Sequence, residues 1–416
     1  MDEVIKKMHA VKEASYALYN LTEEKRNQIL LDLSTALLEA CDFILEENKK
    51  DLSLMQQADS RYDRLLLSKE RIQNIANDVT TVATLPSPIN KILEEKTRPN
   101  GLRIQKVSVP LGVIGVIYES RPNVTVDVFT LCFKAGNACI LKGGKEAHHS
   151  SLALVEIIRR VLHAHHVSPD TLYLMPANRE AAAVLLHARG LVDVCIPRGS
   201  QELINFVREN ATIPVIETGA GIVHTYFDAS GDVEKGQRII ENAKTRRVSV
   251  CNALDSLVIH QQRLTSLPNL VAPLAAKNVE LFADKPSYAQ LVAHYPTKLL
   301  FHATEKDFGR EFLSYKMSIK TVASIEEAIK HIMHYTSGHS EAIIGEDKTA
   351  INYFLNKIDA AAVYVNVSTA FTDGAQFGMG AEIGISTQKI HARGPMALEA
   401  LTSYKWLVFG DGQVRS

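Results

Sequence analysis

The sequence predicts an α/β protein with two domains built on parallel sheets and a projecting hairpin. The chain has 416 residues, too many for a single hydrophobic core, so we expect two domains. Two sets of continuously apolar strand patterns alternate with helical patterns, which is typical of parallel sheets covered by helices on both faces. Asn100-Gly101, the strongest short-range hairpin signal, lies between two extended arms and predicts a turn with positive φ at both positions.

The composition describes a globular protein without a strong charge bias. The chain carries 46 basic and 47 acidic residues, so charge gives no argument for binding nucleic acid or an anionic membrane. It contains no apolar run of eighteen residues, and its charged start predicts an amphipathic helix. We therefore expect neither a membrane span nor a signal peptide.

The cysteines indicate a reducing compartment. The chain has five of them, an odd number, widely scattered and without a CxxC pair. This pattern argues against a disulfide framework and a structural zinc site, and it favours the cytoplasm. The five are Cys41, Cys132, Cys139, Cys195 and Cys251.

The first domain is predicted to comprise residues 1–94 and 111–225. Its first part reads as mostly helical, with Thr22 as the N-cap of one helix. Five strand patterns joined through helices follow. They cover Val113–Tyr118, Ala138–Leu141, Thr171–Met175, Val192–Ile196 and Ile213–Ile216.

The loops after these strands carry the signals for a ligand site. Ligands of open parallel sheets bind at the carboxyl ends of the strands. The loops Lys142–Ala147 and Pro197–Glu202 contain glycine and open helices, whose free N–H groups attract phosphate. A third polar loop, Glu119–Thr125, follows the first strand. No GxGxxG motif is present, so we predict a nucleotide site without the common dinucleotide fingerprint.

A second α/β domain is predicted over residues 226–390. Its strand patterns begin just before it and include Ser256–His260 and Ala362–Val367. Residues 95–110 form the hairpin, which pairs with another segment or subunit because so polar a hairpin is unstable alone. The last pattern, within residues 400–416, is a strand that could be its partner.

Cys251 lies in a short polar turn between a helical pattern over residues 234–247 and the strand pattern Ser256–His260. Lys244, Arg246 and Arg247 place positive charge beside it, which favours thiolate and lowers the pKa of a cysteine. The alternative is a buried structural cysteine, the usual role of a lone thiol.

Four segments together resemble the aldehyde dehydrogenase superfamily, and the resemblance covers nearly the whole chain. They are Pro110–Thr125, Arg247–Ala253, Ala328–Ile343 and Ala381–Pro395. The resemblance is to the branch that reduces L-glutamyl 5-phosphate to L-glutamate 5-semialdehyde with NADPH in proline synthesis. It implies an aldehyde dehydrogenase-like fold, a homo-oligomer and glutamate 5-kinase as a partner.

The resemblance assigns the chemistry to two residues. Cys251 matches the nucleophile, whose thiolate would displace phosphate and form a thioester. Asn123 matches the asparagine that hydrogen-bonds the developing oxyanion. A role as a turn or helix-cap residue is the alternative for Asn123.

Further residues match the cofactor site. Lys142 matches the lysine at the adenosine ribose, and Gly199 and Ser200 match the turn that faces the pyrophosphate. Glu311 matches the carboxylate on the nicotinamide ribose, with an exposed helix end as the alternative.

Two departures from the oxidising relatives are informative. Lys145 stands where they often carry a glutamate that binds the ribose 2′-hydroxyl, and a cation suits the 2′-phosphate of NADP. A solvated surface lysine is the alternative. Glu217 stands where they keep the base that activates water, which a phosphate-releasing reductase does not need. Its role is therefore open.

The candidates for holding the amino-acid head of the substrate are His391 and Arg393. Two other functions stay open. One is NAD(P)-dependent oxidation of a semialdehyde to its acid, and the other is an inactive scaffold that keeps the fold for partner binding. We expect no metal site.

Overall fold

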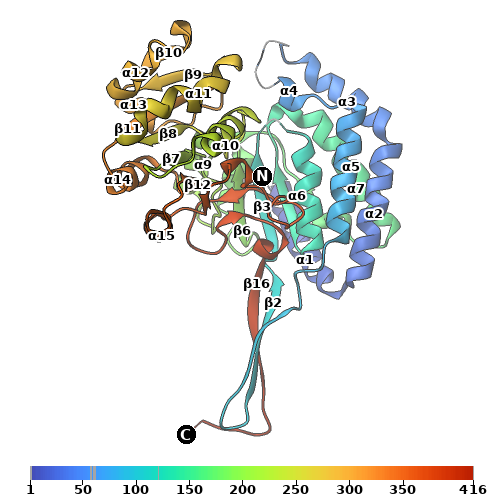
Figure 1. Cartoon of the computed structure of the whole chain (residues 1–416). Coiled ribbons are helices and arrows are strands. Elements are labelled where there is room, and N and C mark those ends of the chain that lie inside the picture. Colours follow the sequence, from blue (N-terminus) through green and yellow to red (C-terminus); the bar gives the residue numbers. More distant parts are fainter. Residues whose placement is uncertain (1, 57–58, 60–61, 120, 416) are drawn as a thin grey trace. The chain divides into compact units, whose positions relative to one another are not determined.

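The computed structural model describes residues 2–56, 59, 62–119 and 121–415. Ser120, in the predicted loop after the first strand, lies outside them. The chain forms two compact units, coloured along the sequence in Figure 1. Unit 1 comprises Met1–Thr218, Gly378–Gly384 and Met396–Ser416, and unit 2 comprises Gly219–Phe377 and Ile385–Pro395. In the part of the chain that the structure describes, no helix is both long and apolar enough to cross a membrane.

Unit 1 begins with a helical region, as predicted. Thr22 caps α2, because its hydroxyl accepts a hydrogen bond from the Lys25 amide at 3.2 Å. Ile29, Leu33 and Leu37 are buried on one face of α2, which packs against α5. The helices are α1 (Asp2–Ala17), α2 (Glu23–Glu39), α3 (Cys41–Ser53), α4 (Tyr62–Leu65) and α5 (Lys69–Thr84).

The sheet of unit 1 is parallel, with strand order β5-β4-β3-β6. Its central strand β3 is buried along its whole length, which explains its continuously apolar sequence. The strands are β3 (Val113–Tyr118), β4 (Ala138–Lys142), β5 (Leu172–Leu174) and β6 (Val194–Arg198). The helices are α6 (Asn123–Lys134), α7 (His148–Ala164), α8 (Arg179–Leu186) and α9 (Gln201–Asn210).

The predicted fifth strand of this sheet, Ile213–Ile216, is wrong. The segment makes only an isolated parallel bridge between Val215 and Cys195. Pro214 accepts from the Cys195 amide at 2.8 Å, and the Ile216 amide donates to Cys195 at 2.9 Å. Pro214 itself has no N–H to donate, so the ladder does not extend.

A separate three-stranded antiparallel sheet, with order β1-β2-β16, confirms the hairpin and its pairing with the last strand of the same chain (Figure 1). The strands are β1 (Ile92–Thr97), β2 (Arg103–Pro110) and β16 (Thr402–Phe409). The predicted two-residue turn is wrong, because only Gly101 has positive φ (85°). The Gly101 amide donates to Arg98 at 2.9 Å and closes a longer turn. Pro99 favours that turn because its ring fixes φ at the second position.

Unit 2 contains a seven-stranded parallel sheet of order β10-β9-β11-β8-β7-β12-β13. Side chains of β8 alternate between two cores, with Leu257 and Ile259 in one and Val258 in the other. The strands are β7 (His224–Phe227), β8 (Ser256–His260), β9 (Glu280–Ala283), β10 (Leu300–His302), β11 (Lys316–Val322), β12 (Ser340–Ile344) and β13 (Ala362–Val365), with the short antiparallel pair β14 (Ile385–Ser386) and β15 (Gly394–Pro395).

Helices connect these parallel strands, as the alternating pattern predicted. They are α10 (Val233–Thr245), α11 (Leu267–Ala276), α12 (Lys285–Leu291), α13 (Glu305–Phe308), α14 (Ile325–Tyr335) and α15 (Lys348–Lys357). The segment between α10 and β8 carries Cys251, so the predicted placement of this residue between a helix and a strand is confirmed.

Candidate active site

The loop that carries Cys251 is anchored at both ends. The Leu254 amide donates to Ala243 at 3.0 Å, and the buried ammonium of Lys244 donates to the Leu254 carbonyl at 2.8 Å. Between these ends, the Asn252 side chain donates to the Thr372 carbonyl at 3.0 Å. These hydrogen bonds join the two ends of the loop and fix the residue that follows the thiol.

Cys251 differs from the structural cysteines of the chain in its accessibility. Cys132, Cys139 and Cys195 are fully buried. Burial raises the pKa of Cys195 to about 12 and that of Cys139 well above its usual value. Cys251 is only half-buried, as is Cys41. Cys251 is therefore not a structural cysteine buried in the core.

Gly221 brings a second segment against the Cys251 backbone. A Cβ atom at Gly221 would lie 1.7 Å from the Cys251 carbonyl oxygen, so only glycine fits this approach. The Gly221 amide donates to Glu311 Oε1 at 2.9 Å. Unit 2 thus brings together Cys251 and Glu311, which are far apart in the sequence.

Glu311 is not the exposed helix-end residue of the alternative interpretation. It is half-buried in the loop that follows α13. Burial raises the pKa of its carboxyl group, and the hydrogen bond from the Gly221 amide opposes that rise. Its carboxylate is therefore held in a fixed direction by the segment that lies against Cys251.

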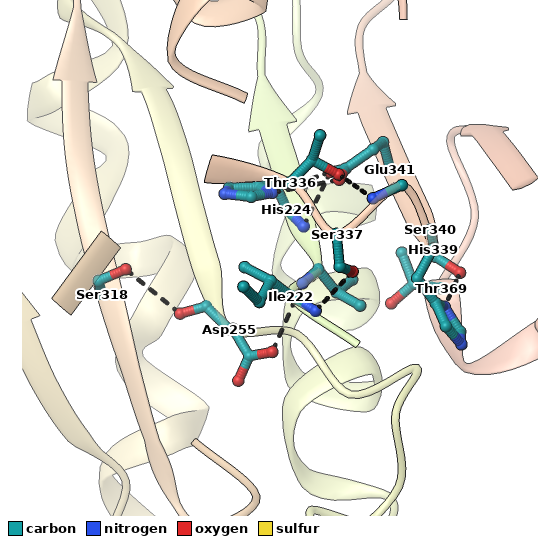
Figure 2. Close-up of polar contacts among 12 residues, drawn as sticks. Ile222, His224, Asp255, Ser318, Thr336, Ser337, His339, Ser340, Glu341 and Thr369 are labelled. Atoms are coloured by element: carbon teal, nitrogen blue, oxygen red, sulfur yellow. Dashed lines mark hydrogen bonds and ion pairs between the residues drawn. The ribbon is translucent and has the colours of Figure 1, made fainter. Parts of the chain in front are cut away.

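Asp255 accepts hydrogen bonds from both of these segments. Its carboxylate accepts from the Phe312 amide at 2.9 Å and from the Val223 amide at 3.4 Å. Figure 2 shows Asp255 beside Ile222 and Ser318. The Ser318 hydroxyl donates a hydrogen bond to the backbone carbonyl of Asp255 at 3.3 Å. The residues next to Glu311 and Gly221 therefore share one buried carboxylate.

Lys244 faces Asp255, with 4.0 Å between its ammonium nitrogen and Asp255 Oδ1. Burial lowers the pKa of Lys244 and raises that of Asp255, and the attraction between the two opposes both shifts. This revises the role predicted for Lys244. Its charge is directed into the interior toward a carboxylate, so it supports the loop rather than adding free positive charge at the turn.

A second buried polar network holds the start of β7 (Figure 2). Glu341 accepts from the His224 amide at 3.0 Å, lies 3.1 Å from His224 Nδ1 and also accepts from the Thr336 hydroxyl. The Ile222 amide donates to the Ser337 hydroxyl at 2.9 Å. We did not predict this network, although a charged residue within the apolar strand Ser340–Ile344 is a signal for it.

In unit 1, Asn123 is the first residue of α6. Its amide nitrogen Nδ2 donates to Asp127 Oδ2 at 2.8 Å, one helical turn further along. The side chain is thus held by a carboxylate and is not used as a helix cap. Asp127 was missed in the sequence, although its spacing of four residues from Asn123 on one helix was visible.

Lys142 ends β4 and is half-buried. Its ammonium donates to the carbonyl groups of Ala177 and Gly143, both at 3.2 Å. Burial lowers its pKa, and the Glu146 carboxylate opposes this. Lys145 is exposed and begins the short helix η2 (Lys145–Ala147).

The turn at Gly199 and Ser200 opens α9. Ser200 caps this helix through its hydroxyl, which accepts from the Leu203 amide at 3.4 Å. The Glu119 carboxylate accepts from the Ser200 amide at 2.9 Å and from its hydroxyl at 3.1 Å. A Cβ atom at Gly199 would lie 2.5 Å from Glu119 Oε2. Glu119 was missed, because its contact depends on the pairing of β3 with β6.

Unit 1 therefore places Lys142 at the carboxyl end of β4 and Gly199 and Ser200 just after the carboxyl end of β6, and these two strands flank β3. Asn123 begins the helix that follows β3. Glu217 accepts a hydrogen bond from Arg208 at 3.4 Å. Among the described residues, no group of three or more His, Cys, Asp or Glu side chains could hold a metal ion.

The two candidates for the substrate head lie near β15 in unit 2. Arg393 donates to Asp359 Oδ1 at 2.7 Å, and Lys389 also contacts this carboxylate. His391 is exposed and has positive φ, 69°. Arg393 already has an acidic partner, so it could bind a substrate carboxylate only in competition with Asp359.

Comparison with known proteins identifies the family. The model described as "Aldehyde dehydrogenase family" matches residues 2–285, which is more than half of the chain. The chain belongs to the aldehyde dehydrogenase family. The predicted resemblance and the predicted fold class are therefore confirmed.

Within this family, the chain is similar over its full length to proteins named gamma-glutamyl phosphate reductase. The one from Chlorobium chlorochromatii is 58% identical and covers 100% of this chain and 99% of its own. The one from Legionella pneumophila (strain Paris) is 59% identical over 99% of each chain. The solved structure of gamma-glutamyl phosphate reductase from Thermotoga maritima has a TM-score of 0.95 at 40% identity over 100% of both chains.

A more distant member has the same fold. The acetylating aldehyde dehydrogenase from Geobacillus thermoglucosidasius is 18% identical and has a TM-score of 0.72, with 100% of this chain and 98% of that chain covered. This chain and that acetylating aldehyde dehydrogenase thus share one fold.

Proposed function

We propose that this chain reduces L-glutamyl 5-phosphate to L-glutamate 5-semialdehyde and releases phosphate, the second step of proline biosynthesis from glutamate. The observation that carries the proposal is an accessible cysteine on a loop anchored at both ends, with a Gly221–Glu311 contact against its backbone. Relatives named for this activity share 57–59% of its residues over nearly the whole length.

The first chemical step uses the sulfur of Cys251. Its thiolate attacks the carbonyl carbon of the acyl phosphate and forms a C–S bond. The bond to the phosphate oxygen breaks, and phosphate leaves with the electron pair, so the product on the enzyme is a thioester. We assign Asn123 to hydrogen-bond the carbonyl oxygen while negative charge develops on it.

The second step returns Cys251 to its starting state. When bound, the nicotinamide of NADPH supplies the hydride that reduces the thioester carbonyl. The C–S bond then breaks, Cys251 leaves as thiolate with the electron pair, and the aldehyde is released. The anchored loop keeps the sulfur in one place through both steps, which favours a reproducible geometry of attack.

The residues of this chain fit a dinucleotide. Two lysines, Lys142 and Lys145, suit its phosphate-bearing adenosine half. The N-terminus of α9 at Gly199 and Ser200 would bind the pyrophosphate in competition with the Glu119 carboxylate. The Glu311 carboxylate can accept hydrogen bonds from a ribose. We assign Lys145 to the 2′-phosphate, and therefore NADP(H) as the cofactor, because its side chain is an exposed cation.

Further assignments combine the family resemblance with the sequence patterns. We propose a cytoplasmic homo-oligomer in which residues 1–94 and 111–225 bind the dinucleotide and residues 226–390 carry the nucleophile. Residues 95–110 and 400–416 serve assembly. Glutamate 5-kinase is the proposed partner, since an acyl phosphate hydrolyses readily in water. His391 and Arg393 remain the candidates for the carboxylate of the amino-acid head.

Running the reaction in reverse tests the function. Glutamate 5-semialdehyde and NADP are mixed with enzyme, with and without inorganic phosphate, and NADPH absorbance is followed. The reductase should make NADPH continuously only when phosphate is present to attack the thioester, and Cys251→Ser should abolish turnover in both conditions. Multiple turnovers without phosphate would instead show that water releases the thioester, with Glu217 as the candidate base. That result would replace the reductase with the oxidative function.

A further inference from the structure

Asp127 lies directly beside the proposed oxyanion donor. Its Oδ2 accepts from Asn123 Nδ2 at 2.8 Å. Both residues belong to α6, four positions apart, so their side chains lie on the same face of the helix. Whatever substrate oxygen Asn123 contacts, the Asp127 carboxylate lies within a few ångströms of it.

The surroundings of Asp127 are unusual for an acidic side chain. It lies deep among protein atoms, and this burial raises the pKa of its carboxyl group to about 6. Arg198 and Arg121 are close enough to lower that pKa, and Asp78 is close enough to raise it. Asp127 nevertheless keeps part of its surface accessible. A residue that is both deep and accessible can be reached by a small ligand.

Holding the Asn123 amide does not require this charge. A neutral asparagine or glutamine would accept the same hydrogen bond through its amide oxygen. Placing a carboxylate at depth instead costs free energy, because the charged form loses hydration. Arg198 and Arg121 offset part of this cost. A ligand cation would offset more of it through a charge-assisted hydrogen bond with the carboxylate. The choice of aspartate at position 127 thus indicates a positively charged ligand group.

The dimensions of the substrate match this arrangement. In L-glutamyl 5-phosphate, four bonds separate the carbonyl carbon from the amino nitrogen, which spans about 5 Å when extended. An oxyanion and an ammonium at ordinary hydrogen-bond distances from Asn123 and Asp127 can lie that far apart.

We propose that the Asp127 carboxylate binds the α-ammonium group of the substrate and makes the enzyme select amino-acid acyl phosphates over those that lack the amino group. This assignment rests on the proposed function and on the role of Asn123 in it. Asp127 is then a specificity-determining residue, and its hydrogen bond to Asn123 couples recognition of the head to placement of the reacting carbonyl.

Two aldehydes that differ only in the amino group test this assignment. Glutamate 5-semialdehyde and glutarate semialdehyde are compared in the phosphate-dependent reverse reaction, and kcat/KM is measured for each. Asp127→Asn keeps an acceptor for Asn123 but removes the charge. We expect its preference for the amino substrate to fall about 10- to 100-fold, mainly through KM, while its kcat/KM for glutarate semialdehyde stays within a few-fold of wild type.

Asp78→Asn is the matched control, because Asp78 is an exposed carboxylate on α5 that acts on Asp127 only through its charge. It should keep the wild-type preference. Asp127→Ala, which removes the acceptor as well, should in addition lower kcat for both aldehydes. Circular dichroism verifies that each variant is folded.

The outcomes separate this assignment from the function on which it rests. If wild-type enzyme shows no phosphate-dependent turnover of either aldehyde, the proposed function itself is overturned. If wild type turns over and Asp127→Asn keeps the wild-type preference, only the assignment of Asp127 fails. Equal losses for both aldehydes in Asp127→Asn would show that Asp127 merely positions Asn123, and would also overturn the proposal.

Discussion

At the scale of single residues, the candidate site depends on side-chain and backbone N–H groups that donate to carboxylates. Asp127 holds the Asn123 amide, Glu119 accepts from Ser200 at the start of α9, and Glu311 accepts from the Gly221 amide. A carboxylate offers only acceptors, so each contact fixes which way the donor points. For Asn123 this keeps the second Nδ2 hydrogen directed away from Asp127, where it can serve an oxyanion.

The role of Asn123 can be measured by truncation. Asn123→Ala should lower kcat by roughly 10²–10³-fold, the usual loss when one oxyanion donor is removed. The loss should appear in kcat/KM as well, because the hydrogen bond strengthens in the transition state. Steady-state kinetics and thermal unfolding are measured together. Unchanged kcat with lowered stability would show that Asn123 supports only the start of α6.

Cofactor preference should respond to the charge at position 145. Lys145→Glu should reduce the kcat/KM of NADPH relative to NADH by about 10- to 100-fold, because a charge-assisted hydrogen bond is lost and repulsion is added. The control is Lys298→Glu, which makes the same charge change at an exposed lysine in unit 2. An unchanged ratio in Lys145→Glu would identify Lys145 as a surface lysine.

Asp127 should also lower the free energy of unfolding, by an amount that depends on pH. Its pKa in the folded protein is about 6, above the ordinary aspartate value of 3.8. Between these values the unfolded chain ionises while the folded chain keeps the proton, so the wild type loses stability as pH rises through this window. The loss is complete above about pH 6.

Asp127→Asn removes this cost. The free energy of unfolding of the variant should therefore exceed that of wild type by about 1–3 kcal/mol at pH 8 and be nearly equal to it at pH 4. Calorimetry at both pH values is the measurement. A variant less stable than wild type at pH 8 would contradict the raised pKa.

At the scale of elements, the segment between α10 and β8 acts as an anchored loop. Lys244, near the end of α10, donates to Leu254, and Asp255, just before β8, accepts from Val223 and Phe312. Three segments that are distant in the sequence are therefore held by one buried pair of opposite charges. Movement of any one of them would leave a charge or an amide unpaired.

Removal of one member of this pair should cost more than removal of both. Asp255→Leu leaves the Lys244 ammonium buried without its carboxylate, and we expect a loss of about 3–5 kcal/mol in unfolding free energy. Adding Lys244→Met should recover a large part of it, since no buried charge remains. Urea unfolding of the single and double variants gives both values. Additive losses would show that the pair is not coupled.

At the scale of the whole molecule, the three-stranded sheet carries large exposed apolar side chains. Tyr404, Trp406 and Val408 on β16 are 50%, 47% and 59% exposed, and alternate residues of a strand share a face. Lys106 lies over the Tyr404 ring at 3.9 Å, and Lys96 and Lys106 each lie 5.8 Å from the centre of the Trp406 ring. We expect this face to take part in the proposed assembly.

A charge placed on this face should weaken the assembly. Val408→Glu should shift the enzyme to a smaller species in analytical ultracentrifugation at micromolar concentration, because a carboxylate would have to be buried. Val292→Glu is the control, since Val292 is 50% exposed and lies in unit 2, outside the residues assigned to assembly. If Val408→Glu sediments like wild type, this face does not mediate assembly.

The sequence by itself determined the features that depend on neighbouring residues. The apolar pattern Ser256–His260, the cap at Thr22 and the position of Cys251 between a helix and a strand all follow from local periodicity and side-chain chemistry. The sequence also predicted the hairpin. It did not predict the exact turn, because Pro99 favours a longer turn than the Asn-Gly pair indicates. Pro214 likewise interrupted a strand whose apolar pattern was otherwise correct.

Only the tertiary structure decided which polar groups share a site. Glu311 reaches Cys251 through Gly221, and Glu119 reaches Ser200 because β3 and β6 are adjacent. Lys244 was predicted to add positive charge beside Cys251, but its ammonium group is buried and faces Asp255. These contacts join residues far apart in the chain, and their partners are selected by strand order and packing rather than by local sequence. Asp127 is the exception. Its partner Asn123 lies one helical turn away in the sequence, and only the burial of Asp127 depended on the tertiary structure.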